Sequence, residues 1–162
     1  MQNDDNTGGV GGTATGGAFN LAGSRGDTDG DGGRAAGPFG GNYGRGAEAV
    51  AAGQTLIGVN GYCLIYEYSD VSASLVGEKL VSTQLLTTAG AGTWTRPTNV
   101  TKIEVWCVGG GGTGASGGGG GTAYLLLDVS AIASIAYVVG ATDISSTFAH
   151  ASPGLIGQRG TN

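Results

Sequence analysis

The sequence is unusually rich in glycine: 36 of its 162 residues are glycine and only 3 are proline, while charged residues make up 12% and the net charge is -5. Collagen would need a strict glycine-every-third repeat with abundant proline, and a disordered tail would need a high charge and few of the hydrophobic residues that form 40% of this chain. A helical enzyme is disfavoured because each helical glycine costs about 0.8–1.0 kcal/mol relative to alanine. The composition therefore predicts a protein built from strands and turns.

The N-terminus, the charge and the cysteines bear on the cellular location of the protein and on its partners. The first residues lack the basic and apolar regions of a secretory signal, so we expect synthesis in the cytoplasm. The apolar stretches, such as residues 124–127, are far shorter than the ~20 residues of a membrane helix, and we expect no membrane insertion. An acidic pI near 4.5 disfavours a nucleic-acid partner. Cys63 and Cys107 lie in apolar runs at a spacing that fits no metal motif, so we interpret them as buried thiols.

Glycine is concentrated in two blocks, residues 8–61 and residues 109–121. Flexible linkers, tight turns and packed extended segments are the three explanations. Interspersed apolar residues such as Phe19 and Leu21 are atypical of linkers, and paired glycines favour close backbone packing. Ordering so much glycine requires many backbone hydrogen bonds from neighbouring segments or subunits, which favours an oligomer.

Short strands are predicted where aromatic and β-branched residues gather. The clearest are residues 62–68, with Tyr62, Leu64, Tyr66 and Tyr68 on one face, and residues 102–108, with Ile103, Val105 and Cys107 opposite Lys102, Glu104 and Trp106. The other predicted strands, in chain order, are residues 54–59, 81–88, 93–95, 122–129 and 135–139, and residues 128–133 are the one hint of a helical turn. The expected fold is all-β, a sandwich or barrel-like module of six to eight short strands with extended glycine-rich loops.

The C-terminal half contains a series of motifs in a characteristic order. A G-T-W-T-R-P strand at residues 92–97 precedes the pattern V-x-x-I-x-V-x-x-x-G-G-G-G at residues 100–112. A tyrosine-bearing strand at residues 123–125 and a Val-Gly step at residues 137–140 follow. In this order the motifs resemble the glycine-rich domain of bacteriophage tail-fibre and related virion proteins, whose next strand is similar to residues 146–148.

The N-terminal half resembles the later portion of the same family. Residues 11–23 are similar to a mid-domain stretch of paired glycines, and residues 52–68 are similar to the closing strand. The resemblance divides the chain into a half-module at 1–68, a connector at 69–84 and a half-module at 85–162, with the family's second half placed first. The two halves either close within one chain or exchange between subunits, a head-to-tail contact that generates rings or filaments.

Three alternating carboxylates form the one candidate metal site. Asp27, Asp29 and Asp31 precede Gly32 as in the opening of a calcium loop, whose oxygen ligands stand at alternate positions before a glycine turn. The twelfth position, which should be a bidentate glutamate, is Pro38, so a solvated acidic turn is the alternative interpretation.

We expect no catalytic residue, no cofactor and no enzymatic activity. His150 is the sole histidine and has no nucleophile motif near it in sequence, so we interpret it as a surface or packing residue. The glycine run at residues 109–121 lacks the Lys-Ser/Thr of a phosphate-binding loop, which disfavours a nucleotide site.

The expected function is that of a structural or adhesive virion protein of a bacteriophage, in a tail fibre, spike or other appendage. It would assemble with itself, as a trimer or a head-to-tail polymer, and with other virion proteins. By analogy with the family, loops at one end would present a surface to a host glycan or receptor, with Phe39, Tyr43 and Trp94 as stacking residues. The alternative is a subunit of a bacterial extracellular filament that polymerises by strand complementation; the swapped order favours it and the missing signal opposes it.

Overall fold

The computed structural model describes residues 9–26, 32–35, 38, 43–47, 57–70, 77–114, 117–151 and 154–161, and within them the chain forms ten strands and no helix. The strands are β1 (Ala14–Thr15), β2 (Phe19–Leu21), β3 (Tyr62–Asp70), β4 (Glu78–Leu86), β5 (Gly90–Thr95), β6 (Lys102–Val108), β7 (Thr122–Asp128), β8 (Ser134–Val139), β9 (Ser146–Phe148) and β10 (Leu155–Gly157). They form two five-stranded antiparallel sheets. Sheet A has the order β1-β10-β9-β8-β5, and sheet B has the order β2-β7-β6-β3-β4. The all-β prediction is confirmed, as an open sandwich rather than a closed barrel.

Most predicted strands are found where the alternation of side chains placed them. β6 has the predicted bounds, and the segment predicted at residues 62–68 extends to Asp70 as β3. β4 begins three residues before the strand predicted at 81–88, so much of the predicted connector is a strand of sheet B. Residues 57–59 of the strand predicted at 54–59 belong to no strand. They lie instead among the packed glycine segments described below.

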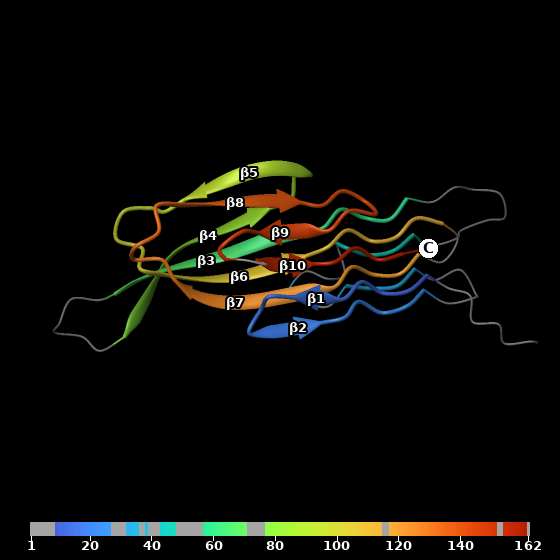
Figure 1. Cartoon of the computed structure of the whole chain (residues 1–162), viewed down its shortest axis with the longest axis horizontal. Coiled ribbons are helices and arrows are strands. Elements are labelled where there is room, and N and C mark those ends of the chain that lie inside the picture. Colours follow the sequence, from blue (N-terminus) through green and yellow to red (C-terminus); the bar gives the residue numbers. More distant parts are fainter. Residues whose placement is uncertain are drawn as a thin grey trace, which may run out of the picture.

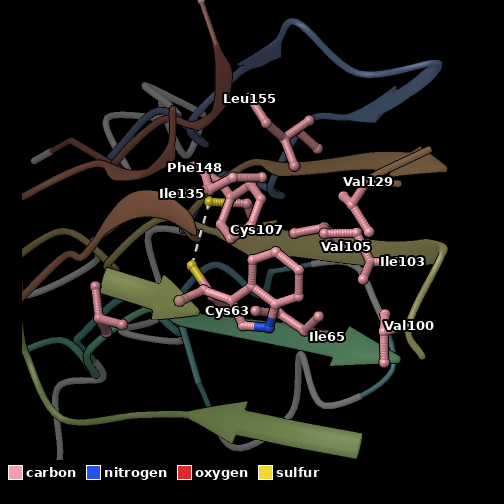
Figure 2. Packing of buried hydrophobic residues seen from close by; sticks show 13 residues of the cluster. Cys63, Ile65, Val100, Ile103, Val105, Cys107, Val129, Ile135, Phe148 and Leu155 are labelled. Carbon is pink, nitrogen blue, oxygen red and sulfur yellow. Dashed lines mark hydrogen bonds between the residues drawn. The ribbon is translucent and has the colours of Figure 1, made fainter. Parts of the chain in front are cut away.

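The core lies between the two sheets, as Figure 2 shows. Alternate residues of β3 and β6 point into it, because successive side chains of a strand face opposite sides of the sheet. The buried cluster consists of Cys63, Ile65, Trp94, Val100, Ile103, Val105, Cys107, Ala123, Val129, Ile135, Val139, Phe148 and Leu155. The remaining side chains of both strands face the other side of sheet B, where Tyr62, Leu64 and Val108 form a second, smaller buried cluster with Ala35.

The N-terminal and C-terminal halves are interleaved in the same sheets. β3 pairs with β6 and β2 pairs with β7, so strands of both halves are hydrogen-bonded to each other in sheet B. At the edge of sheet A, β1 pairs with β10, and further along the Thr161 amide donates to the Val10 carbonyl at 2.9 Å. In the single chain described, the two halves thus pair with each other. Their exchange between subunits stays a prediction.

Beyond the strands, the glycine-rich segments bond to one another through their backbones. Successive N–H groups of residues 117–121 point in three directions, and every third one donates to the same neighbouring segment. The donors and acceptors are, in order, Gly117 to Ala47, Gly118 to Thr161, Gly119 to Ser24, Gly120 to Gly44 and Gly121 to Gln158, at 2.7–3.2 Å. A three-residue period is that of the polyproline II conformation, which has no internal hydrogen bonds and offers every N–H to a neighbour.

The neighbouring glycine run follows the same rule. Gly109 and Gly112 donate to the carbonyls of Gly121 and Gly118, while Gly110 and Gly111 donate to other segments. We call this arrangement the glycine lattice; it comprises residues 9–13, 22–26, 32–35, 43–47, 57–61, 109–112, 117–121 and 158–161. In Figure 1 its segments continue past the strands toward the end where the C-terminus lies. The interpretation of the glycine blocks as packed extended backbone is confirmed in these segments.

Candidate functional site

The outer face of sheet B carries a group of aromatic residues around one carboxylate. In the register of the sheet, Tyr66 on β3 and Leu126 on β7 lie on either side of Glu104 on β6. One row along, Trp106 on β6 lies opposite Tyr124 on β7. These residues share the face of sheet B that points away from the cluster between the sheets, and Tyr66 and Trp106 pack against the smaller buried cluster on this face. We call this surface the Glu104 face, and it comprises Tyr66, Tyr68, Glu104, Trp106, Tyr124 and Leu126.

Glu104 holds two of the aromatic side chains in place. The Tyr68 hydroxyl donates to Oε2 of Glu104 at 3.0 Å, and the indole Nε1 of Trp106 donates to Oε1 at 3.1 Å. The rings of Trp106 and Tyr124 pack with centroids 4.7 Å apart and planes inclined at 50°. An ionised carboxylate accepts about four hydrogen bonds, so both oxygens of Glu104 keep capacity for further donors.

Burial and the Glu104 carboxylate together raise the pKa values of two tyrosines on this face. Partial burial raises the pKa of Tyr68 to about 12, and the hydrogen bond to Glu104 and its negative charge raise it as well. Burial also raises the pKa of Tyr124, with a smaller contribution from the charge of Glu104. Both hydroxyls therefore remain protonated, and able to donate hydrogen bonds, well above neutral pH.

Apolar and charged side chains flank the Glu104 face. Leu126 leaves 51% of its surface exposed, and Leu80 and Leu85 of the edge strand β4 are exposed as well. Beyond Tyr68, Lys102 forms an ion pair with Glu78. The face is therefore a partly apolar surface with one hydrogen-bonded carboxylate near its middle.

Two of the three predicted stacking residues can be located, and neither lies on an open surface. Trp94 is only 2% exposed and donates from Nε1 to Oε1 of Glu67 at 2.7 Å, so its prediction as a stacking residue is wrong. Tyr43 is half-buried with its ring edge-on to Tyr62, at a centroid distance of 5.4 Å. Phe39 lies outside the described residues. The alternation in β3 and β6 was the signal for the Glu104 face, but it did not tell which side of each strand is outside.

A second carboxylate, Glu67, is fully buried between the sheets. Besides Trp94 it accepts hydrogen bonds from Nε2 of Gln84, at 2.7 Å, and from the Ser82 hydroxyl. Trp94 belongs to β5 of sheet A, whereas Gln84 and Ser82 belong to β4 of sheet B. A buried carboxylate is tolerated only when it is hydrogen-bonded, so Glu67 fixes how the two sheets meet.

The two cysteines are confirmed as buried thiols. Cys63 and Cys107 lie directly opposite each other on β3 and β6, with their Sγ atoms 3.5 Å apart (Figure 2). The hydrogen bond to Cys107 and burial raise the pKa of the Cys63 thiol well above its usual value. The Cys63 thiol is therefore protonated at neutral pH, and burial shields both sulfur atoms from solvent.

The remaining candidates from the sequence are the three aspartates of the possible calcium loop and His150. Asp27, Asp29 and Asp31 lie outside the described residues, and calcium binding there stays a prediction. His150 is half-buried with Nδ1 3.4 Å from the Phe148 carbonyl oxygen. Within the described ranges, no three His, Cys, Asp or Glu side chains converge as metal ligands. The same ranges hold no helix of the length and apolarity needed to span a membrane.

No protein-family model, curated protein or solved structure matches the chain.

Proposed function

We propose that the protein is a structural and adhesive component of a bacteriophage virion, in a tail fibre, spike or other appendage. The motif order given above supports this proposal, and so does the glycine lattice that those motifs form. The observation of most weight is the period of the lattice, in which every third N–H of residues 117–121 donates to the same neighbour.

The lattice suits a part that must keep its shape outside a cell. Each segment is bonded on several sides, so no segment can shift without stretching hydrogen bonds to more than one neighbour. Few side chains are needed, because backbone groups supply both donors and acceptors. The result is an extended support at one end of the sandwich (Figure 1).

The edge of sheet B supports assembly into an oligomer. β4 is a nine-residue edge strand, and most of its side chains are exposed. Leu80, Val81 and Leu85 are exposed apolar residues on this strand. An exposed, apolar edge strand of this length pairs readily with another chain. We propose that β4 contacts another subunit or another virion protein.

Electron microscopy of intact particles tests the proposal. Gold-labelled antibodies against the chain should mark an appendage of the virion, and light scattering of the recombinant chain should give an oligomer. Free fibres without label on particles would instead favour the bacterial filament. A folded monomer at every concentration, together with unlabelled particles, would refute both functions.

A further inference from the structure

The chemistry of the Glu104 face points to a specific kind of ligand, and we propose that this face binds a neutral glycan. The inference deepens the adhesive part of the proposed function and rests on it. The juxtaposition that supports it is an acceptor carboxylate, Glu104, held among aromatic rings on one face of sheet B.

The aromatic rings supply the apolar half of such a site. A pyranose ring presents C–H groups on its faces, and these pack on the electron-rich faces of aromatic rings. Tyr66 and Tyr68 lie two residues apart on β3 and therefore side by side on the outer face. Leu126, opposite Glu104, extends the apolar surface across β7.

Glu104 supplies the polar half. Sugar hydroxyls are hydrogen-bond donors, and a carboxylate is the strongest acceptor that a protein side chain provides. The bonds from Tyr68 and Trp106 hold the carboxylate in one orientation, so a ligand need not order it on binding.

Charge decides which glycans fit. The chain has a net charge of -5, and the carboxylate near the middle of the face repels sialic acids, uronic acids and phosphorylated sugars. Nucleic acids stack on aromatic rings too, but their phosphates meet the same repulsion. Quaternary ammonium ions are typically recognised by cages of aromatic rings that surround the cation. Here the rings belong to neighbouring strands of one sheet, which favours a flat ligand.

A glycan array tests the inference with the full chain, using neutral and acidic oligosaccharides in the same experiment. Three variants are informative: Glu104→Gln, Leu126→Arg and, as the matched control, Ile144→Arg. Ile144 is 52% exposed, against 51% for Leu126, and lies between β8 and β9 of sheet A. Circular dichroism and thermal melting establish that each variant is folded.

We expect the native chain to retain neutral oligosaccharides. Glu104→Gln and Leu126→Arg should each weaken this binding about tenfold or more, the usual loss for one charge-assisted hydrogen bond or one blocked apolar contact, while Ile144→Arg has no effect. The bound oligosaccharide should also protect Trp106 from acrylamide quenching. Trp94, the second tryptophan, is too buried to contribute.

Four results would overturn the inference. They are retention of no neutral glycan, preference for acidic glycans, equal loss in the control variant, and displacement by choline rather than by free sugar. Virion location by electron microscopy is a separate measurement. A labelled appendage with no glycan binding would therefore refute this inference and leave the proposed function standing.

Discussion

The glycine lattice makes a sharp prediction about a single methyl group at Gly58. A Cβ on Gly58 would lie 2.6 Å from the Gly112 carbonyl oxygen and 2.7 Å from that of Gly111. Ordinary contact begins at 3.4 Å, so the segments must separate by about 0.8 Å. The hydrogen bond from the Gly111 amide to the Val59 carbonyl, now 2.9 Å, would then stretch to about 3.7 Å, beyond bonding range.

The cost of Gly58→Ala follows from that lost bond. Leaving its donor and acceptor unpaired costs roughly 1–3 kcal/mol, and the residual crowding costs about 1–3 kcal/mol more. Alanine also lowers the conformational entropy of the unfolded chain, which stabilises the folded state by about 0.4–1 kcal/mol. We expect a net loss of roughly 1–5 kcal/mol, which corresponds to a fall in Tm of about 2–20 °C for a chain of this size.

Urea unfolding and thermal melting, followed by circular dichroism, measure this loss. Ile57→Ala is the matched control, because the adjacent side chain is 72% exposed and its removal should change stability by less than about 0.5 kcal/mol. If Gly58→Ala unfolds at the same urea concentration as Ile57→Ala, the lattice does not stabilise the fold as argued.

Three further predictions concern side chains. Glu67→Leu should destabilise the protein by roughly 1–3 kcal/mol in urea unfolding, because the buried Nε1–H of Trp94 loses its acceptor; unchanged stability would contradict the role of Glu67 in joining the sheets. Tyr68 should ionise near pH 12 in an ultraviolet titration, so the stability it contributes is complete below pH ~10 and lost as pH rises through 12. Glu104→Gln should bring that pKa closer to its ordinary value, and an unchanged titration would show that burial alone raises it. Cys63 and Cys107 should resist a thiol reagent in the native protein and react together on unfolding; fast labelling without denaturant would contradict their burial.

Local patterns predicted the strands because alternation is a property of neighbouring residues. The Ile103, Val105 and Cys107 side of β6, which the alternation separated from Lys102, Glu104 and Trp106, lies in the core. The position of Trp94 could not be predicted in this way. Its environment depends on Glu67, which is 27 residues away and belongs to the other sheet. An aromatic residue before a proline turn is equally compatible with a surface loop.

The exposure of the Glu104 face could not be predicted from local pattern either. The sequence placed Tyr66 and Tyr68 on one side of their strand, but both sides of that strand are rich in apolar residues. Which side is covered by the opposite sheet is decided only when the sandwich forms. The early part of β4 was missed for a related reason: Glu78 and Lys79 are polar because the strand lies at an edge, and edge strands do not alternate clearly.

By itself, the sequence determined that this protein is all-β and that its glycines are packed rather than loose, because composition and short-range pattern are enough for both conclusions. Only the tertiary structure decided which backbone groups meet in the glycine lattice. A polyproline II segment has no hydrogen bonds of its own, so every partner lies in a distant part of the chain. Gly118, for example, donates to Thr161, and no local pattern around either residue specifies that contact.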